Sequence, residues 1–191
     1  MYPLVLDIET KETFADVGGH EPSKLSVSMV CIYSYKEGKF LSFTEHELSS
    51  LWPYLDAADV LVGFNIRHFD LPVLARHYPG NIEALPVFDL LEAVKSVLGF
   101  RLKLDTLVQA TLGTAKSGSG LDAVRWYREG QIEKIRQYCI QDVAVTRDLF
   151  EYGRQHGKFF YTDFGIKKEF PVRFDLSQFE KKMLQNLTLP L

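Results

Sequence analysis

The N-terminal half of the chain alternates between short apolar runs and turn residues, a pattern that predicts strands. The predicted strands are Leu4–Ile8, Ser26–Tyr35, Lys39–Phe43, Asp59–Phe64 and Val87–Phe88. The second and third alternate between apolar and polar residues on either side of Lys36-Glu37-Gly38, which predicts a hairpin. The first and fourth are mainly apolar, as expected of strands that are buried on both faces.

Apolar residues spaced by three and four predict helices between and after these strands. The predicted helices are Glu45–Ala57, Leu71–Tyr78, the segment from Asp89 to Leu98, Lys103–Leu112, Leu121–Glu129 and Gln131–Tyr152. Pro53 should bend or divide the first of them. Lys158–Tyr161 and Ile166–Arg173 flank Asp163-Phe164-Gly165 and predict a second hairpin, which a weakly amphipathic tail follows at Leu176–Asn186.

Four carboxylates and one tyrosine lie in three separated segments of this pattern. Asp7 and Glu9 are two residues apart in the first strand, so they point to one face. Tyr138 and Asp142 are four residues apart on the long helix, so they also share a face. Asp70 lies where the chain leaves a strand and enters a helix, and ligand sites of open α/β sheets lie at strand carboxyl ends. The three segments are therefore predicted to meet at one cleft.

Carboxylates gathered in a cleft suit hard cations such as Mg²⁺, and two such cations can stabilise both oxygens of a phosphodiester displacement. Two of the segments also have a simpler interpretation. Asp7 and Glu9 could be solvated carboxylates at a strand exit, and Asp70 could cap a helix before Pro72. Asp142 is harder to explain without a metal, because it adjoins the apolar stripe of its helix and a buried carboxylate is costly unless paired or bound.

In order and spacing, the five residues resemble the motifs of the DEDD superfamily of 3′→5′ exonucleases, in its tyrosine-bearing branch (DEDDy). The motifs are Asp7-x-Glu9, Asn65-x-x-x-Phe69-Asp70 and Tyr138-x-x-x-Asp142. The chain is most similar to predicted stand-alone exonucleases related to the exonuclease domain of B-family DNA polymerases. This resemblance implies an α/β, ribonuclease H-like fold with a mixed five-stranded sheet and helices on both faces. We expect that domain at residues 1–155, with the C-terminal hairpin and tail, residues 156–191, packed on it.

The resemblance also implies an activity, which is hydrolysis of phosphodiester bonds at the 3′ end of single-stranded DNA or RNA with two divalent cations, Mg²⁺ or Mn²⁺. Asp7 would bridge both cations. Glu9 and Asp142 would hold the cation that activates water, and Asp70 would support the other. Tyr138 would orient the water or help to deprotonate it. A polymerase or helicase could be a partner, but the sequence does not identify one.

Further residues near the motifs are candidates for holding the substrate, namely Thr10, Phe14, Phe64, Asn65 and Lys116. Phe14 lies in a predicted loop and is the best candidate to stack on the terminal base, whereas Phe69 is expected in the core. Lys116, in a flexible Gly-rich segment, could touch a phosphate. Three other basic residues either contact phosphates or line a solvated face, namely Arg67, Arg101 and Lys103.

Several other patterns have ordinary explanations. Asp89 and Asp105 each precede a helical run, which favours capping over metal binding. The segment 113–117 resembles a phosphate-binding loop but lacks its Gly-Lys-[Ser/Thr] core. His68 and His77 have no matching third zinc ligand.

Composition restricts the partners and the compartment. The net charge of −3 argues against a nucleic-acid coat protein, which would be broadly basic, and less against a nuclease with an acidic site. Cys31 and Cys139 match no metal or disulfide spacing, so we expect two core thiols and a reducing compartment. The N-terminus resembles no signal sequence, and no apolar run approaches the ~20 residues of a membrane helix. We therefore expect a cytoplasmic protein with no membrane partner.

Two other functions fit parts of the sequence. Aspartyl-phosphate phosphatases, which depend on Mg²⁺, begin with a strand like Leu4–Thr10, but they carry Asp where this chain has Glu9 and need a downstream lysine motif. A non-catalytic ribonuclease H-like module could bind nucleic acid or a protein partner. The presence of all five site residues argues against such a module.

Overall fold

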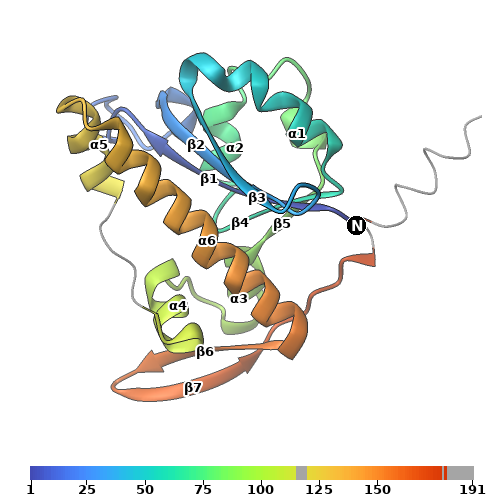
Figure 1. The fold of residues 1–191 in the computed structure, drawn as a ribbon. Helices are drawn as coiled ribbons and strands as arrows, with labels where there is room; N and C mark the ends of the chain where they lie inside the picture. Colours follow the sequence, from blue (N-terminus) through green and yellow to red (C-terminus); the bar gives the residue numbers. More distant parts are fainter. Residues whose placement is uncertain (115–119, 178, 180–191) are drawn as a thin grey trace, which may run out of the picture.

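The computed structural model of this chain describes residues 1–114, 120–177 and 179. Its centre is a mixed five-stranded sheet in the order β3-β2-β1-β4-β5 (Figure 1). The strands are β1 (Pro3–Thr10), β2 (Val27–Ser34), β3 (Lys39–Thr44), β4 (Val60–Gly63) and β5 (Val87–Asp89). The five predicted strands are confirmed. β1 pairs antiparallel with β2 from Leu4 to Thr10, but pairs parallel with β4 only over Pro3–Val5.

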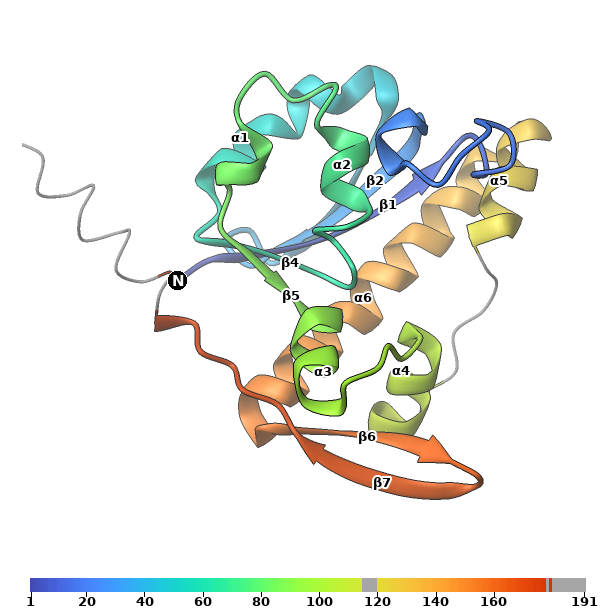
Figure 2. The ribbon, with the colours of Figure 1, turned by 180° about the vertical axis from the view of Figure 1, so that it is seen from behind.

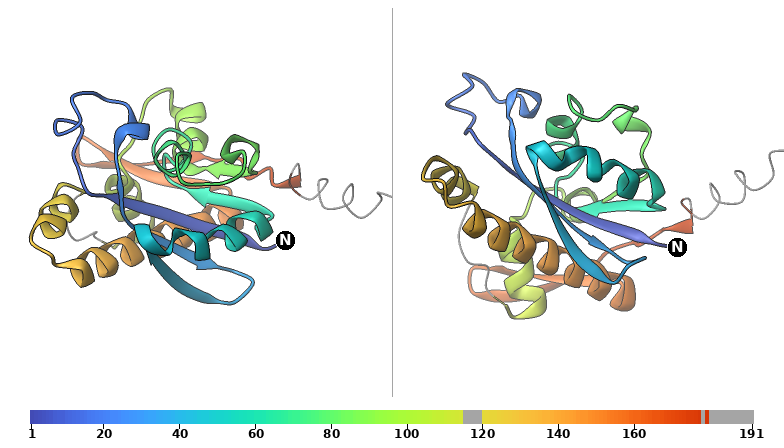
Figure 3. Two further views of the ribbon diagram at one scale, coloured as in Figure 1. Left: turned by 90° about the horizontal axis from the view of Figure 1, so that it is seen from above. Right: turned by 45° about the horizontal axis from the view of Figure 1, so that its top comes forward.

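Helices cover both faces of the sheet, as predicted (Figures 1 and 3). On one face lie α1 (Trp52–Ala57) and α2 (Asp70–Leu74). On the other face lie α3 (Leu90–Leu98), α4 (Leu104–Leu112), α5 (Gly120–Arg128) and α6 (Ile132–His156). α6 runs diagonally across the sheet and touches β1 and β2. None of the helices in the described ranges combines the length and the apolar character that a membrane crossing requires.

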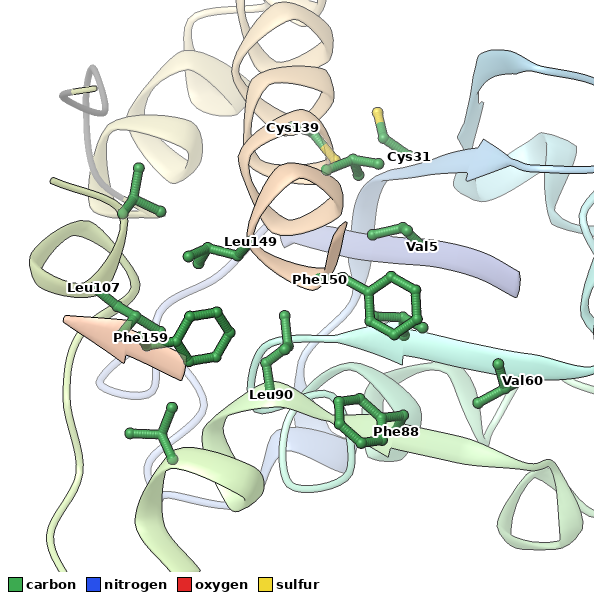
Figure 4. Packing of buried hydrophobic residues seen from close by; sticks show 14 of the residues in the cluster. Val5, Cys31, Val60, Phe88, Leu90, Leu107, Cys139, Leu149, Phe150 and Phe159 are labelled. Atoms are coloured by element: carbon green, nitrogen blue, oxygen red, sulfur yellow. The ribbon is translucent and has the colours of Figure 1, made fainter. Parts of the chain in front are cut away.

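The alternation of β1 decides which face receives the acidic residues. Leu4, Leu6 and Ile8 belong to the core on the α1 and α2 side. Val5 belongs to the core under α6, where it lies near Cys139 and Phe150 (Figure 4). Because residues two apart share a face, Asp7 and Glu9 point to the α6 side as Val5 does.

The C-terminal hairpin is also confirmed, as β6 (Lys158–Asp163) and β7 (Ile166–Pro171), and it lies below α3 and α4 in Figure 2. Phe159 and Phe170 bury their rings in the core that α6 covers. The following segment packs so closely on α6 that a Cβ atom on Gly153 would lie 2.2 Å from the Phe174 ring. A unit boundary at residue 155 stays a prediction, and most of the predicted tail lies outside the described residues.

The predicted division of Glu45–Ala57 at Pro53 is confirmed, because a 3₁₀ helix covers Glu45–Ser50 and α1 starts at Trp52 with the proline in its first turn. Two other helix predictions differ from the structure. α2 ends at Leu74 instead of Tyr78, and the chain continues as turns up to Pro79. Helical geometry is unfavourable for the residue that precedes a proline, here Tyr78. The capping prediction for Asp105 is wrong, because the N-cap of α4 is Lys103 and Asp105 lies inside the first turn.

Candidate metal-dependent active site

Three carboxylates meet where the carboxyl end of β1 passes α6. Asp7, Glu9 and Asp142 each offer an oxygen atom, and these atoms lie within 4.8 Å of one another. Glu9 and Asp142 are buried and Asp7 is half-buried. Oxygen donors at this spacing suit a hard divalent cation, whose charge would offset their mutual repulsion.

Local packing fixes the two elements that bring these carboxylates together. The thiol of Cys139 on α6 donates to the backbone carbonyl of Asp7 at 3.4 Å, so the helix is held directly against the strand. Cys31, the neighbour of Asp7 on β2, packs beside Cys139 (Figure 4). Both cysteines are free and buried, as predicted. A register shift between Glu9 and Thr10 ends the regular pairing with β2 beside the site, a common position for bulges.

Asp70 reaches the same site from the start of α2, which covers the other face of the sheet from α6. Its carboxylate is not part of the cluster of three. The N-cap of α2 is Phe69, so the capping interpretation of Asp70 is wrong. The Oδ1 atom of Asp70 accepts the backbone N–H of Ile8 at 3.1 Å, at a point of β1 beyond its pairing with β4. Asp70 is buried and lines the cleft that contains Asp7, Glu9 and Asp142.

Burial raises the pKa of the Asp70 carboxyl well above its ordinary value of 3.8. The negative charges of Asp89 and Asp142 raise this pKa further, while the N–H groups of Asp70 itself and of Ile8 lower it. The net effect disfavours the charged carboxylate whenever no cation is present.

Tyr138 extends from the same face of α6 as Asp142. Burial raises the pKa of its phenol, and so do the charges of Asp142, Glu9 and Asp7 and a hydrogen bond with Asp142. The ring is nearly fully buried and packs edge-on to Trp126 with 5.9 Å between centroids. In the cation-free protein the hydroxyl therefore stays protonated at neutral pH and can act as a hydrogen-bonding group.

Asp89 fixes the loop that leads to Asp70. Its Oδ1 accepts N–H groups of Leu91 and Glu92, so the predicted helix cap is confirmed. Asp89 also accepts the N–H of Asn65 at 2.9 Å and of Arg67 at 3.1 Å, a role that the sequence did not reveal. Asn65 has a φ of 67°, a left-handed conformation that asparagine tolerates better than most residues.

The cleft around the carboxylates has a volume of about 400 Å³. Four of the five predicted substrate-binding residues line it, namely Thr10, Phe14, Phe64 and Asn65. The Thr10 hydroxyl donates to the Glu12 carbonyl, and the Phe14 ring packs edge-on to the Phe69 ring at 6.1 Å. The fifth, Lys116, lies outside the described residues.

α5 also forms part of the cleft, a contribution that was not predicted from the sequence. Gly120, Leu121 and Val124 line it, and a Cβ atom on Gly120 would lie 4.0 Å from Glu9 Oε2. Leu121 is 70% exposed although it is apolar. Its place at the start of a predicted helix was the only available signal.

The chain belongs to the RNase H superfamily, because the model of that family matches residues 4–153. The ribonuclease H-like fold is thus confirmed, and this membership supports a nuclease-type function in general. It leaves the aspartyl-phosphate phosphatase alternative without support.

A solved structure shows the same fold. The chain is similar to the family B DNA polymerase from the hyperthermophilic archaeon Pyrobaculum calidifontis, with a TM-score of 0.62 and 18% identity. The match covers 81% of this chain and 24% of the polymerase, so the chain spans about a quarter of the length of that protein. No curated protein matches the chain.

We predict that Asp70→Asn stabilises the protein in EDTA at pH 7. The pKa of Asp70 is higher in the folded state than in the unfolded state, so protonation of its carboxyl increases the free energy of unfolding. This contribution is fully present below pH 3.8 and is lost as the pH rises through the folded-state pKa. Asparagine stays neutral at every pH and can still accept the N–H of Ile8. The variant should therefore be more stable than the wild type at pH 7, and this difference in the free energy of unfolding should vanish in acid. Each unit of raised pKa corresponds to about 1.4 kcal/mol in the free energy of unfolding.

Asp89→Asn is the matched control, measured by urea denaturation under the same conditions. Its oxygens accept from four backbone N–H groups, so the amide should lower the free energy of unfolding by about 1–3 kcal/mol. If Asp70→Asn destabilised the metal-free protein as Asp89→Asn does, Asp70 would be a structural carboxylate.

Proposed function

We propose that this protein is a metal-dependent 3′→5′ exonuclease that removes nucleotides from the 3′ end of single-stranded DNA or RNA. The observation that carries the proposal is the cluster of Asp7, Glu9 and Asp142 within 4.8 Å, with Asp70 and Tyr138 next to it. Membership of the RNase H superfamily supports phosphodiester hydrolysis. The 3′→5′ direction rests on the resemblance of the motifs to tyrosine-bearing DEDD exonucleases.

The donor set fits two divalent cations, Mg²⁺ or Mn²⁺. Asp7, Glu9 and Asp142 would hold one cation, and Asp7 with Asp70 would hold the other. When bound, such cations neutralise charge on the phosphate and make water acidic enough to attack. Every ligand is a carboxylate, and this agrees with the preference of Mg²⁺ and Mn²⁺ for oxygen donors.

The chain's own residues position the reacting groups. The resemblance implies that Tyr138 either orients the attacking water or helps to deprotonate it. Because the pKa of its phenol is raised, we propose the orienting role, in which the hydroxyl forms a hydrogen bond with water or a phosphate oxygen. Phe14 lies at the cleft, where the rings of Phe69 and His20 support its own ring, and it would stack on the terminal base. The cleft volume is in the range of pockets that hold one small ligand such as a nucleotide.

Asp7→Asn tests the proposal directly. Release of mononucleotides from labelled single strands in Mn²⁺ should fall by at least about 10²-fold, because a few kcal/mol of charge stabilisation is lost. Single strands labelled at either end would report the direction of digestion. Asp148→Asn, the same change at an exposed site of α6, should retain activity. Wild-type activity in Asp7→Asn, from protein free of contaminating nuclease, would contradict the proposal.

Tyr138→Phe removes one oxygen and leaves the packing of α6 nearly unchanged. If the hydroxyl orients a reacting group, turnover should fall by about 10²-fold, equivalent to roughly 2.7 kcal/mol of transition-state stabilisation. Because the pKa of Tyr138 is raised, the fall should be the same factor at pH 6 and pH 9. A purely structural hydroxyl would instead cost about 1 kcal/mol of stability and leave turnover unchanged.

A further inference from the structure

A second hollow, of about 320 Å³, adjoins the active-site cleft. Asn65 lines both hollows, so they are neighbours at this residue. We call the second hollow the Arg101 groove, and its polar lining includes Asn65, His68, Glu92, Lys95 and Arg101. It runs along α3 and the segment that joins α3 to α4.

Arg101 stands at the junction of the groove and the cleft. Its Nη2 donates to Asn65 Oδ1 at 2.7 Å. This bond uses one of the five N–H donors of the guanidinium. Asn65 is itself held by its backbone N–H, which donates to Asp89. The positive charge of Arg101 is therefore tied to Asn65, a residue that also lines the active-site cleft.

The groove is basic although the chain carries a net charge of −3. Lys95 and Arg101 are both exposed. The carboxylate among the lining residues, Glu92, forms an ion pair with Arg67 at 3.2 Å and contacts His68 Nε2 at 3.2 Å. Pairing with Arg67 leaves the positive charges of Lys95 and Arg101 to dominate the groove, which suits an anionic ligand.

An exposed aromatic residue adjoins Arg101 in the chain, just outside the residues that line the groove. Phe100 is 46% exposed and precedes Arg101 in the chain. Its ring packs edge-on to Tyr161 of β6 at 5.9 Å, so its orientation is supported by the hairpin. Surfaces that bind single-stranded nucleic acid combine cations for the phosphates with aromatic rings for the bases.

We propose that the Arg101 groove binds the substrate strand next to its terminal nucleotide, with Lys95 and Arg101 on successive phosphates and Phe100 against a base. This inference rests on the proposed function and adds the path of the strand to it. The ligand is a single-stranded polynucleotide, because a free nucleotide in the active-site cleft would not reach the groove.

Salt dependence of binding tests the groove without catalysis. Binding of a fluorescent oligothymidylate to protein in EDTA would be measured by anisotropy over a series of NaCl concentrations. Lys95→Gln and Arg101→Gln should each reduce the slope of log K against log salt by about 0.7, as expected for one lost phosphate contact on a single strand. Phe100→Ala should weaken binding by about tenfold without changing the slope.

Lys36→Gln is the matched control, because Lys36 is exposed at the β2–β3 turn, next to the start of β1 and away from its acidic end. This variant should keep the wild-type slope. A kinetic comparison completes the test. The ratio of kcat/KM for the oligonucleotide to kcat/KM for a dinucleotide should fall by about tenfold in Lys95→Gln and Arg101→Gln.

Wild-type slopes and wild-type ratios in both groove variants would overturn the inference, and the proposed function would stand if the wild type still released mononucleotides. An equal fall of kcat/KM for the oligonucleotide and for the dinucleotide would also overturn the inference. It would mean that Arg101 affects the active-site cleft through its hydrogen bond to Asn65 and does not contact the rest of the strand. A wild type that neither bound nor cleaved single strands would remove the proposed function, and the groove with it.

Discussion

Repulsion between buried carboxylates is the constraint on which this structure depends. Asp7, Glu9 and Asp142 hold oxygens within 4.8 Å of one another, and Asp70 adds a fourth carboxylate, itself buried, in the same cleft. Burying like charges is unfavourable unless cations or protons neutralise them. The raised pKa values of Asp70 and Tyr138 are consequences of this arrangement. A fold that keeps such a cluster has to hold it rigidly from several directions.

The surrounding core supplies that rigidity. β1 is paired on both edges at its start, and α6 is held against it by the Cys139 thiol on the Asp7 carbonyl. On the other edge of β1, Asp70 replaces the missing strand partner by accepting the Ile8 N–H. Asp89 then ties the loop before Asp70 to the start of α3. The same loop carries Asn65, which connects the carboxylate cleft to the basic Arg101 groove.

Local periodicity was sufficient to predict the strands, the long helix and the common face of Tyr138 and Asp142, because these features depend on spacing within one element. The role of Asp89 was not predictable in this way. It depends on hydrogen bonds with Asn65 and Arg67, which are distant from Asp89 in the chain. The contribution of α5 to the cleft, and the position of Arg101 beside Asn65, likewise depend on tertiary packing that single-sequence patterns do not contain.

The central claim is that the four carboxylates form a cation site, and the most direct measurement is the thermal midpoint with and without Mn²⁺. A cation that binds only the folded protein stabilises it by about 2.7 kcal/mol at a hundredfold excess over its dissociation constant. The midpoint of the wild type should therefore rise with Mn²⁺, and that of Asp7→Asn combined with Asp142→Asn should rise much less. An equal rise in both proteins would show that the cations bind elsewhere and would contradict the account.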